Sequence, residues 1–144
     1  MAAASGLPAK IRLQIVSAER SLVDELVDEV EIPGWDGYFG VWPGHTPLLA
    51  ALSVGTLSYR QGPERRLLVL AFGFAEVQPD RVTILAQIAE RPEEIDFERA
   101  RAARTRAEER IATPTADIDV ERARIAMLKA LVRLQAAERA RMRS

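Results

Sequence analysis

The sequence contains no cysteine and a single histidine, His45. Without thiols the chain can form neither a disulfide nor a thiolate metal site, and one imidazole excludes a zinc site with paired histidines. Catalytic signatures are also missing, because there is no phosphate-binding Gly-rich loop, no dinucleotide fingerprint and no nucleophile elbow beside His45. We therefore predict no catalytic residue and no bound metal, and expect His45 to be a turn residue whose ring hydrogen-bonds the backbone.

Long apolar runs are absent as well. No stretch approaches the roughly 20 apolar residues that span a bilayer, and the opening MAAASGLPAK lacks the cationic start of a secretory signal. With 48% hydrophobic and 28% charged residues, the composition is typical of a soluble globular protein. We expect such a protein in a reducing compartment.

Charge is nearly balanced overall, at −1, but it is distributed unevenly. Residues 1–90 carry 7 basic and 11 acidic side chains, whereas residues 91–144 carry 13 and 10, which gives a body of −4 and a tail of +3. The basic tail leaves a nucleic-acid-binding adaptor open as an alternative. Its interspersed acidic residues and its lack of interleaved aromatic residues disfavour that alternative, which requires salt-dependent phosphate contacts and base stacking.

Glycine is absent from Pro92 onward, and this absence marks a change in the chain. Before Pro92, Gly- and Pro-rich turns separate short alternating or apolar stretches at 11–16, 26–32, 56–60, 65–72 and 81–86. Such spacing predicts an all-β domain, a sandwich or barrel, over residues 8–90.

After Pro92 the composition turns to Ala, Arg and Glu, which are strong helix formers. Thr113-Pro114 interrupts this stretch, because a residue before proline is pushed out of the helical region. We predict two helices, at 94–112 and 117–142, joined by a short link into an antiparallel hairpin over residues 93–142.

One hexapeptide pattern occurs twice in this tail, as IDFERA at 95–100 and IDVERA at 118–123. Each copy lies at a predicted helix start, where an aspartate can cap free backbone N–H groups and complement the helix dipole. Capping and helix propensity alone account for either copy. The residues by themselves leave open whether either copy is also a binding site.

The two helices are expected to meet along a seam of small side chains, with the second helix contributing Ala123, Met127, Ala130, Leu134 and Ala137. Cationic residues border this seam on both helices, namely Arg99, Arg106 and Arg110 on the first and Arg122, Lys129 and Arg133 on the second. An anion between the two rows would relieve their repulsion, although long cationic side chains can also splay into water. Because alanines bury few methylene groups, the hairpin should be the least stable part of the chain.

Three stretches carry a resemblance to a known family: LQIVSAERSL, IPGWDGYFGVWPGHTPLLAALSVGTLSY and FGFAEVQPDRVTILA. Over about residues 10–142 the chain resembles the epsilon subunit of the F-type ATP synthase. The resemblance implies a β-sandwich followed by a helical hairpin, in a non-catalytic subunit at the foot of the rotating central stalk. It also implies binding to the gamma subunit and the c-subunit ring, as a peripheral protein on the cytoplasmic face of the bacterial plasma membrane. Such a subunit couples proton-driven rotation to ATP synthesis, and in many bacteria an extended hairpin reaches the alpha/beta head and inhibits ATP hydrolysis.

Some bacterial members of this family bind ATP through an I/L-D-x-x-R-A motif at the start of the first helix. The resemblance therefore implies a nucleotide role for IDFERA and only a helix start for IDVERA. The implied nucleotide-binding residues are Glu90, Ile95, Asp96, Arg99, Ala100, Arg106, Lys129 and Arg133. The best-binding members carry arginine where this chain has Lys129, and lysine lacks the bidentate fork. No cofactor is required, and ATP would be a regulatory ligand that favours a compact hairpin. A coupling subunit without ATP sensing remains an alternative within the family.

The turn-rich segment 34–47 matches the family's loop region near the c ring. The resemblance makes Asp36, Tyr38 and His45 candidates for contact with that ring, although members often carry an acidic residue in place of Tyr38. Trp35, Tyr38 and Trp42 could equally pack in the core or in a turn.

Overall fold

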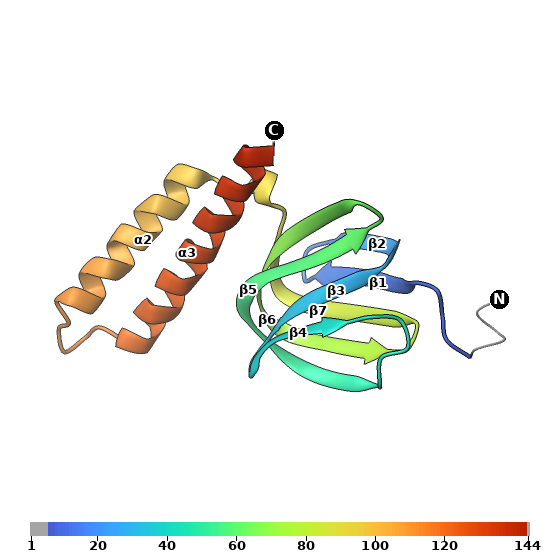
Figure 1. Cartoon of the computed structure of the whole chain (residues 1–144). Helices are drawn as coiled ribbons and strands as arrows, with labels where there is room; N and C mark the ends of the chain where they lie inside the picture. Colours follow the sequence, from blue (N-terminus) through green and yellow to red (C-terminus); the bar gives the residue numbers. More distant parts are fainter. Residues whose placement is uncertain (1–5, 144) are drawn as a thin grey trace. The chain divides into compact units, whose positions relative to one another are not determined.

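The computed structural model describes residues 6–143, with the side chains of residues 6–142. The chain divides between Ala89 and Glu90 into two compact units (Figure 1). The first unit consists of strands and the second consists of helices.

Within residues 6–143, seven β-strands form one hydrogen-bonded sheet with the order β2-β1-β7-β6-β5-β3-β4. Strand β1 pairs with β7 in parallel, and β5 pairs with β6 in antiparallel orientation along most of their length. The strands are β1 (Ile11–Ser17), β2 (Ser21–Val27), β3 (Glu29–Gly34), β4 (Gly37–Val41), β5 (Leu48–Gln61), β6 (Glu64–Gln78) and β7 (Arg81–Glu90).

The sheet folds over on itself, because side chains from both of its ends share one core. Leu22 and Val27 from the edge strand β2 belong to the same buried cluster as Val30 and Val41 from β3 and β4. The alternation read from β1 also holds, since Ile11, Leu13 and Ile15 are fully buried. The sandwich predicted from the sequence is confirmed.

The two long strands β5 and β6 carry the fold from one layer into the other (Figure 1). Their register is the same on both sides of the pairs Leu52–Gly73 and Val54–Ala71, between which Phe72 has φ 61°, next to Gly73 with φ 120°. A Cβ atom on Gly73 would overlap the carbonyl oxygen of Leu85 on β7. Only glycine fits there, because a glycine inside a strand allows another backbone to approach this closely.

Several strand boundaries predicted from the sequence are wrong. The stretch 26–32, predicted as one strand, spans the end of β2 and the start of β3, and it breaks at Asp28. The Asp28 carboxylate accepts hydrogen bonds from Lys10, from the Gly62 backbone N–H at 2.7 Å and from Arg60 at 3.3 Å. These donors, with Lys10 contributing most, hold the pKa of Asp28 below its usual range.

Glycines inside strands explain why the other strands were predicted too short or missed. Gly55, predicted as a turn signal, lies inside the 14-residue β5, where a Cβ would overlap the Tyr38 hydroxyl and the Pro33 ring. The segment 34–47, predicted as a loop, contains β4, which pairs with β3. Glycine here allows close packing rather than a chain reversal.

The second unit contains a short 3-10 helix, η1 (Pro92–Glu94), followed by α2 (Phe97–Ala112) and α3 (Val120–Arg143). The two α-helices lie side by side and run in opposite directions (Figure 1), which confirms the predicted hairpin. Each begins three residues later than predicted. The small-residue seam is also present, with Ala100 and Ala107 of α2 and Ala123, Ala130, Leu134 and Ala137 of α3 buried. None of the described helices is long and apolar enough to cross a bilayer.

Candidate functional site

Both copies of the hexapeptide begin a helix in the same way. The Asp96 carboxylate accepts a hydrogen bond from the backbone N–H of Arg99 at 3.0 Å, and Asp119 accepts one from Arg122 at 3.1 Å. Each aspartate therefore satisfies one of the free N–H groups of the first helical turn. The predicted helix-start role is confirmed for both copies, and it also explains the later helix starts, since a cap residue precedes the helix.

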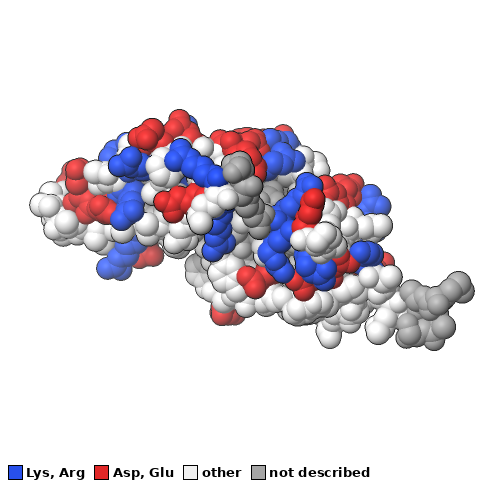
Figure 2. Space-filling view, turned by 45° about the horizontal axis from the view of Figure 1, so that its top comes forward, with Lys and Arg blue, Asp and Glu red and all other residues white. Residues whose placement is uncertain are grey.

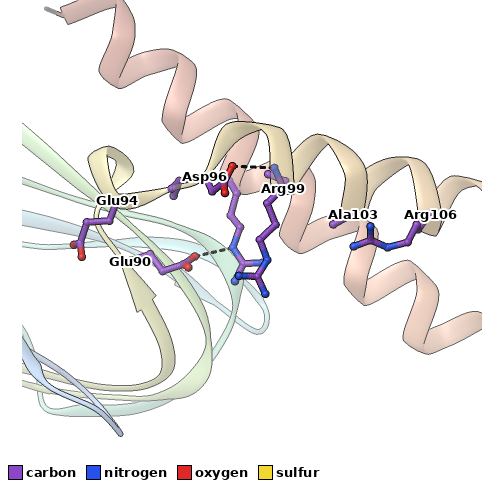
Figure 3. Close-up of a pocket in the computed structure, with 9 residues that line it drawn as sticks. Glu90, Glu94, Asp96, Arg99, Ala103 and Arg106 are labelled. Carbon is purple, nitrogen blue, oxygen red and sulfur yellow. Dashed lines mark hydrogen bonds and ion pairs between the residues drawn. The ribbon is translucent and has the colours of Figure 1, made fainter.

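The first copy lines a pocket of about 350 Å³ in the helical unit (Figure 3). Its walls come from Glu90 at the end of β7, the η1 segment and the residues that follow it, α2 as far as Arg106, and Arg133 of α3. The lining residues are Glu90, Glu94, Ile95, Asp96, Arg99, Ala100, Ala103, Arg106 and Arg133. A volume of this size lies within the range of about 300–1,000 Å³ that small-molecule sites occupy.

Seven of the eight nucleotide-binding residues expected from the resemblance thus meet at one pocket. The exception is Lys129, which is half-buried on α3 but does not line the pocket. Lys129 lies four residues before Arg133, which places it about 6 Å further along the helix axis. Two lining residues were not predicted, Glu94 and Ala103. Ala103 shares the helix face of Arg99, so periodicity could have found it. Glu94 enters through the η1 turn, which was not predicted as a separate element.

Three arginines give the pocket its cationic character. Within residues 6–142, whose side chains are described, the guanidinium groups of Arg99 and Arg106 have no carboxylate partner. Arg133 is different, because its Nε donates to Oε1 of Glu90 at 2.7 Å. In Figure 3 the dashed line from Glu90 marks this bond, and a second dashed line marks the Asp96 cap. The pocket therefore offers two cations without a carboxylate partner and a third that one carboxylate holds.

The carboxylates of the pocket are mostly engaged elsewhere in local bonds. Asp96 caps α2, and Glu94 forms an ion pair with Arg91 at 3.5 Å. Three arginines and three acidic residues line the pocket, so its formal charge cancels. Such a site suits a ligand with an anionic part for the guanidinium groups and a hydrogen-bonding part for the carboxylates. Among residues 6–143, no group of three or more potential metal ligands is present.

The second copy also lines a hollow, of about 410 Å³, but with fewer elements. Its lining residues are Arg110, Asp117, Ile118, Asp119, Arg122 and Ala123. They come only from the last turn of α2, the interhelical loop and the first turn of α3. Asp117 accepts a hydrogen bond from the Thr115 hydroxyl at 2.7 Å, and this bond, helped by a backbone N–H, lowers the pKa of Asp117. Among residues 6–142, none from a more distant segment lines this hollow.

The three residues proposed to contact the c ring lie on the surface of the sandwich unit. Asp36 is exposed, and Tyr38 is 57% exposed although its hydroxyl accepts from the Thr56 backbone N–H at 3.0 Å. His45 Nδ1 lies 2.6 Å from the Thr46 carbonyl oxygen and is therefore the donor, which confirms the predicted turn role. Trp35 and Trp42 are 68% and 58% exposed, so the core-packing alternative is wrong for them.

Surface charge is mixed on the face shown in Figure 2. Basic and acidic side chains alternate over the helices, and no continuous basic area covers this face. Ion pairs also form along α2, such as Arg104 with Glu108 at 2.7 Å and Arg101 with Glu98 at 3.8 Å. This face offers mixed charge to a partner and no continuous basic track.

Comparison with known proteins identifies similar chains over nearly the whole length. Residues 10–92 match the family "ATP synthase, Delta/Epsilon chain, beta-sandwich domain", and residues 93–138 match "ATP synthase, Delta/Epsilon chain, long alpha-helix domain". An ATP synthase epsilon chain of Syntrophobacter fumaroxidans is 48% identical over 90% of this chain and 97% of its own length. One of Solibacter usitatus is 42% identical over 92% of this chain and 99% of its own length. A chain in the cryo-EM structure of the Euglena gracilis mitochondrial ATP synthase, OSCP/F1/c-ring, has a TM-score of 0.78 and 26% identity, covering 94% of this chain and 83% of that one.

Proposed function

The chain belongs to the ATP synthase delta/epsilon chain family, and from this premise we propose that it is the epsilon subunit of a proton-translocating F-type ATP synthase whose helical hairpin senses ATP. In this role it is a non-catalytic part of the rotor. It sits peripherally at the cytoplasmic face of the membrane, couples rotation to ATP synthesis and regulates ATP hydrolysis.

One observation carries the ATP-sensing part of the proposal, namely that residues distant in sequence meet at one pocket. Glu90, Arg99 and Arg133 belong to three different elements, and all line the same hollow. The triphosphate would lie against the three arginines, because guanidinium groups bind phosphate oxygens with strong, charge-assisted hydrogen bonds. The adenosine part would lie toward Ile95 and Ala100. Its exocyclic amine could donate to lone pairs that the pocket's carboxylates do not use in their present bonds.

The physical effect of ATP follows from where its contacts lie. Arg99 and Arg106 are on α2 and Arg133 is on α3, so a bound triphosphate bridges the two helices. A ligand shifts a conformational equilibrium by its differential affinity for the two forms. Free ligand at 100 times its Kd stabilises the binding form by about 2.7 kcal/mol, enough to change the population of a hairpin held by a thin alanine seam. High ATP then favours the closed hairpin, and low ATP favours an extended one that reaches the alpha/beta head and inhibits hydrolysis.

The sandwich unit is proposed to bind the other subunits of the rotor. Trp35 donates its backbone N–H to the Ala51 carbonyl oxygen at 2.9 Å, and Ala51 pairs across the strands with Phe74. Trp35 and Phe74 are 68% and 57% exposed, which leaves apolar surface available for another protein. We assign this surface to the gamma subunit. The c-subunit ring would contact the loop segment with Asp36, Tyr38 and His45.

The absence of cysteine allows a direct test of hairpin closure. Two exposed positions, Ala102 on α2 and Gln135 on α3, can be changed to cysteine and labelled with a fluorescent donor and acceptor. ATP should shift and narrow the distribution of transfer efficiencies toward the high values of the closed hairpin. An ATP synthase assembled with a chain whose hairpin is held closed should hydrolyse ATP faster than one assembled with the wild-type chain. If millimolar ATP changes neither the distance distribution nor the melting temperature, the chain is a coupling subunit without ATP sensing.

A further inference from the structure

We propose that Glu90 is an internal competitor for the anionic ligand of the first pocket, an inference that rests on the proposed ATP site. In the empty hairpin, Glu90 occupies the partner position at Arg133 that a phosphate oxygen would take. When a polyanion binds, it therefore replaces Glu90 as the partner of Arg133, instead of pairing with a cation that had no partner.

The geometry of the ion pair supports this exchange. The Nε–Oε1 distance is 2.7 Å, and the side chains of Arg133 and Glu90 are only 28% and 32% exposed. Partly shielded charges are costly to leave without a partner. Arg133 should consequently keep Glu90 until another anion replaces it, and both Glu90 and Arg133 line the pocket where that anion would lie.

The neighbouring arginines differ from Arg133 in this respect. Arg99 and Arg106 are exposed, and among residues 6–142 no carboxylate pairs with either guanidinium group. They are seven residues apart on α2, which is about 10 Å along the helix axis. A polyphosphate can contact these two groups first and then reach Arg133, where it must displace Glu90.

The exchange sets the ligand concentration to which the hairpin responds. The apparent Kd equals the intrinsic Kd divided by the fraction of molecules in which Arg133 is available. Glu90 lowers that fraction, so it raises the ligand concentration needed for half-saturation. Glu90 also gives Arg133 a partner when no polyanion is bound. The polyanion therefore adds less stability to the closed hairpin than it would if Arg133 had no partner.

The test uses inorganic tripolyphosphate, a polyanion without a base, titrated calorimetrically into the full-length chain. Glu90→Gln removes the competing charge, and Glu94→Gln is the matched control, because Glu94 lines the same pocket but pairs with Arg91, which does not. We expect Glu90→Gln to bind tripolyphosphate about two- to fivefold more tightly than Glu94→Gln does, the range that partly exposed ion pairs support. Equal affinity in the two variants would overturn the proposal, since only general pocket charge would then matter.

A second readout follows the exchange itself. In the wild-type chain, tripolyphosphate should move the ¹³C resonance of the Glu90 carboxylate toward that of a free glutamate, while the Arg133 Nε–H stays protected from hydrogen exchange. An unchanged Glu90 resonance in the saturated complex contradicts the exchange, even though ATP binding itself would stand. If neither ATP nor tripolyphosphate binds the wild type or Glu90→Gln, the ATP site fails and this inference fails with it. Binding by Glu90→Gln alone supports the competitor role.

Discussion

IDFERA and IDVERA differ in one letter and begin their helices with the same hydrogen bond, yet they lie in different surroundings. Around the first copy, residues from β7, η1, α2 and α3 meet, and the cation of Arg133 faces Glu90. Around the second copy, only the adjoining loop and the last turn of α2 are present. A motif thus becomes a candidate binding site when the fold brings residues from other elements next to it.

The antiparallel hairpin produces this difference. The start of α2 lies where the chain enters the unit, next to Glu90, and opposite the end of α3 with Arg133 and Arg141. The start of α3 lies at the other end of the hairpin, where, among the described residues, the interhelical loop and the last turn of α2 line its hollow. The same capped helix start therefore has a partner-rich position in one case and a solvent-facing position in the other.

The largest effect should come from removing the residue that only the first copy meets. Arg133→Gln should weaken ATP binding by about 10- to 100-fold, because a charged hydrogen bond contributes about 1.5–3 kcal/mol. The control is Arg124→Gln, on the same helix, whose ion pair with Glu121 at 3.8 Å is highly exposed. Calorimetric titration measures both variants, and similar affinities would remove the distinction between the two copies.

The caps should behave alike in stability and differ in binding. Asp96→Ala and Asp119→Ala should each destabilise the hairpin by about 1 kcal/mol, since each removes one cap hydrogen bond. Native-state hydrogen exchange of α2 and α3 amides measures this loss. Only Asp96→Ala should also weaken ATP binding. A large stability difference between the two variants would show that the caps are not equivalent.

The one differing letter can be exchanged. Phe97 packs under the guanidinium group of Arg141, whose carbon lies 4.3 Å from the ring centroid, whereas the second copy has Val120 at this position. Phe97→Val should destabilise the hairpin by roughly 0.5–1 kcal/mol through loss of the cation–π contact. Val120→Phe is the reciprocal control and should not stabilise it comparably. Thermal melts followed by circular dichroism measure both variants. If Val120→Phe raises the melting temperature as much as Phe97→Val lowers it, this role for Phe97 is contradicted.

The smallest effect is a pH dependence at Asp117, the residue just before the second copy. The Thr115 hydroxyl lowers the pKa of Asp117 in the folded chain below its value in the unfolded chain. The resulting stability is fully present above the unfolded pKa and is lost as pH falls through the lowered folded pKa. The Asp117 carboxyl resonance should therefore titrate below about 3.9, the usual aspartate value. In Thr115→Val it should titrate closer to that value, and an unchanged midpoint would exclude the hydroxyl as the cause.

Part of this account could be read from residue types alone. Aspartate before a helical run predicted both caps, and strand alternation predicted the sandwich. The absence of glycine from Pro92 onward, with the rise of alanine and arginine, predicted the hairpin. The strands containing Gly55 and Gly73 were predicted too short, because their glycines allow side-chain and backbone packing that depends on the fold.

The pocket could not be predicted from the local sequence pattern alone. The resemblance supplied its residues, but the pairing of Glu90 with Arg133 and the position of Lys129 outside the pocket required the packed hairpin. Helical periodicity places Lys129 and Arg133 on one face, and it does not say how far along that face the pocket extends. Contacts between residues 43 positions apart arise only from tertiary structure.

The central claim is that the first hexapeptide binds ATP and the second only begins a helix. Calorimetric titration of the full-length chain with ATP, beside Arg99→Ala and Arg122→Ala, tests it most directly, because the two arginines hold the same place in the two copies. The account predicts that Arg99→Ala loses at least about tenfold in affinity while Arg122→Ala stays within about twofold of wild type. Equal losses in both variants, or loss only in Arg122→Ala, would contradict it.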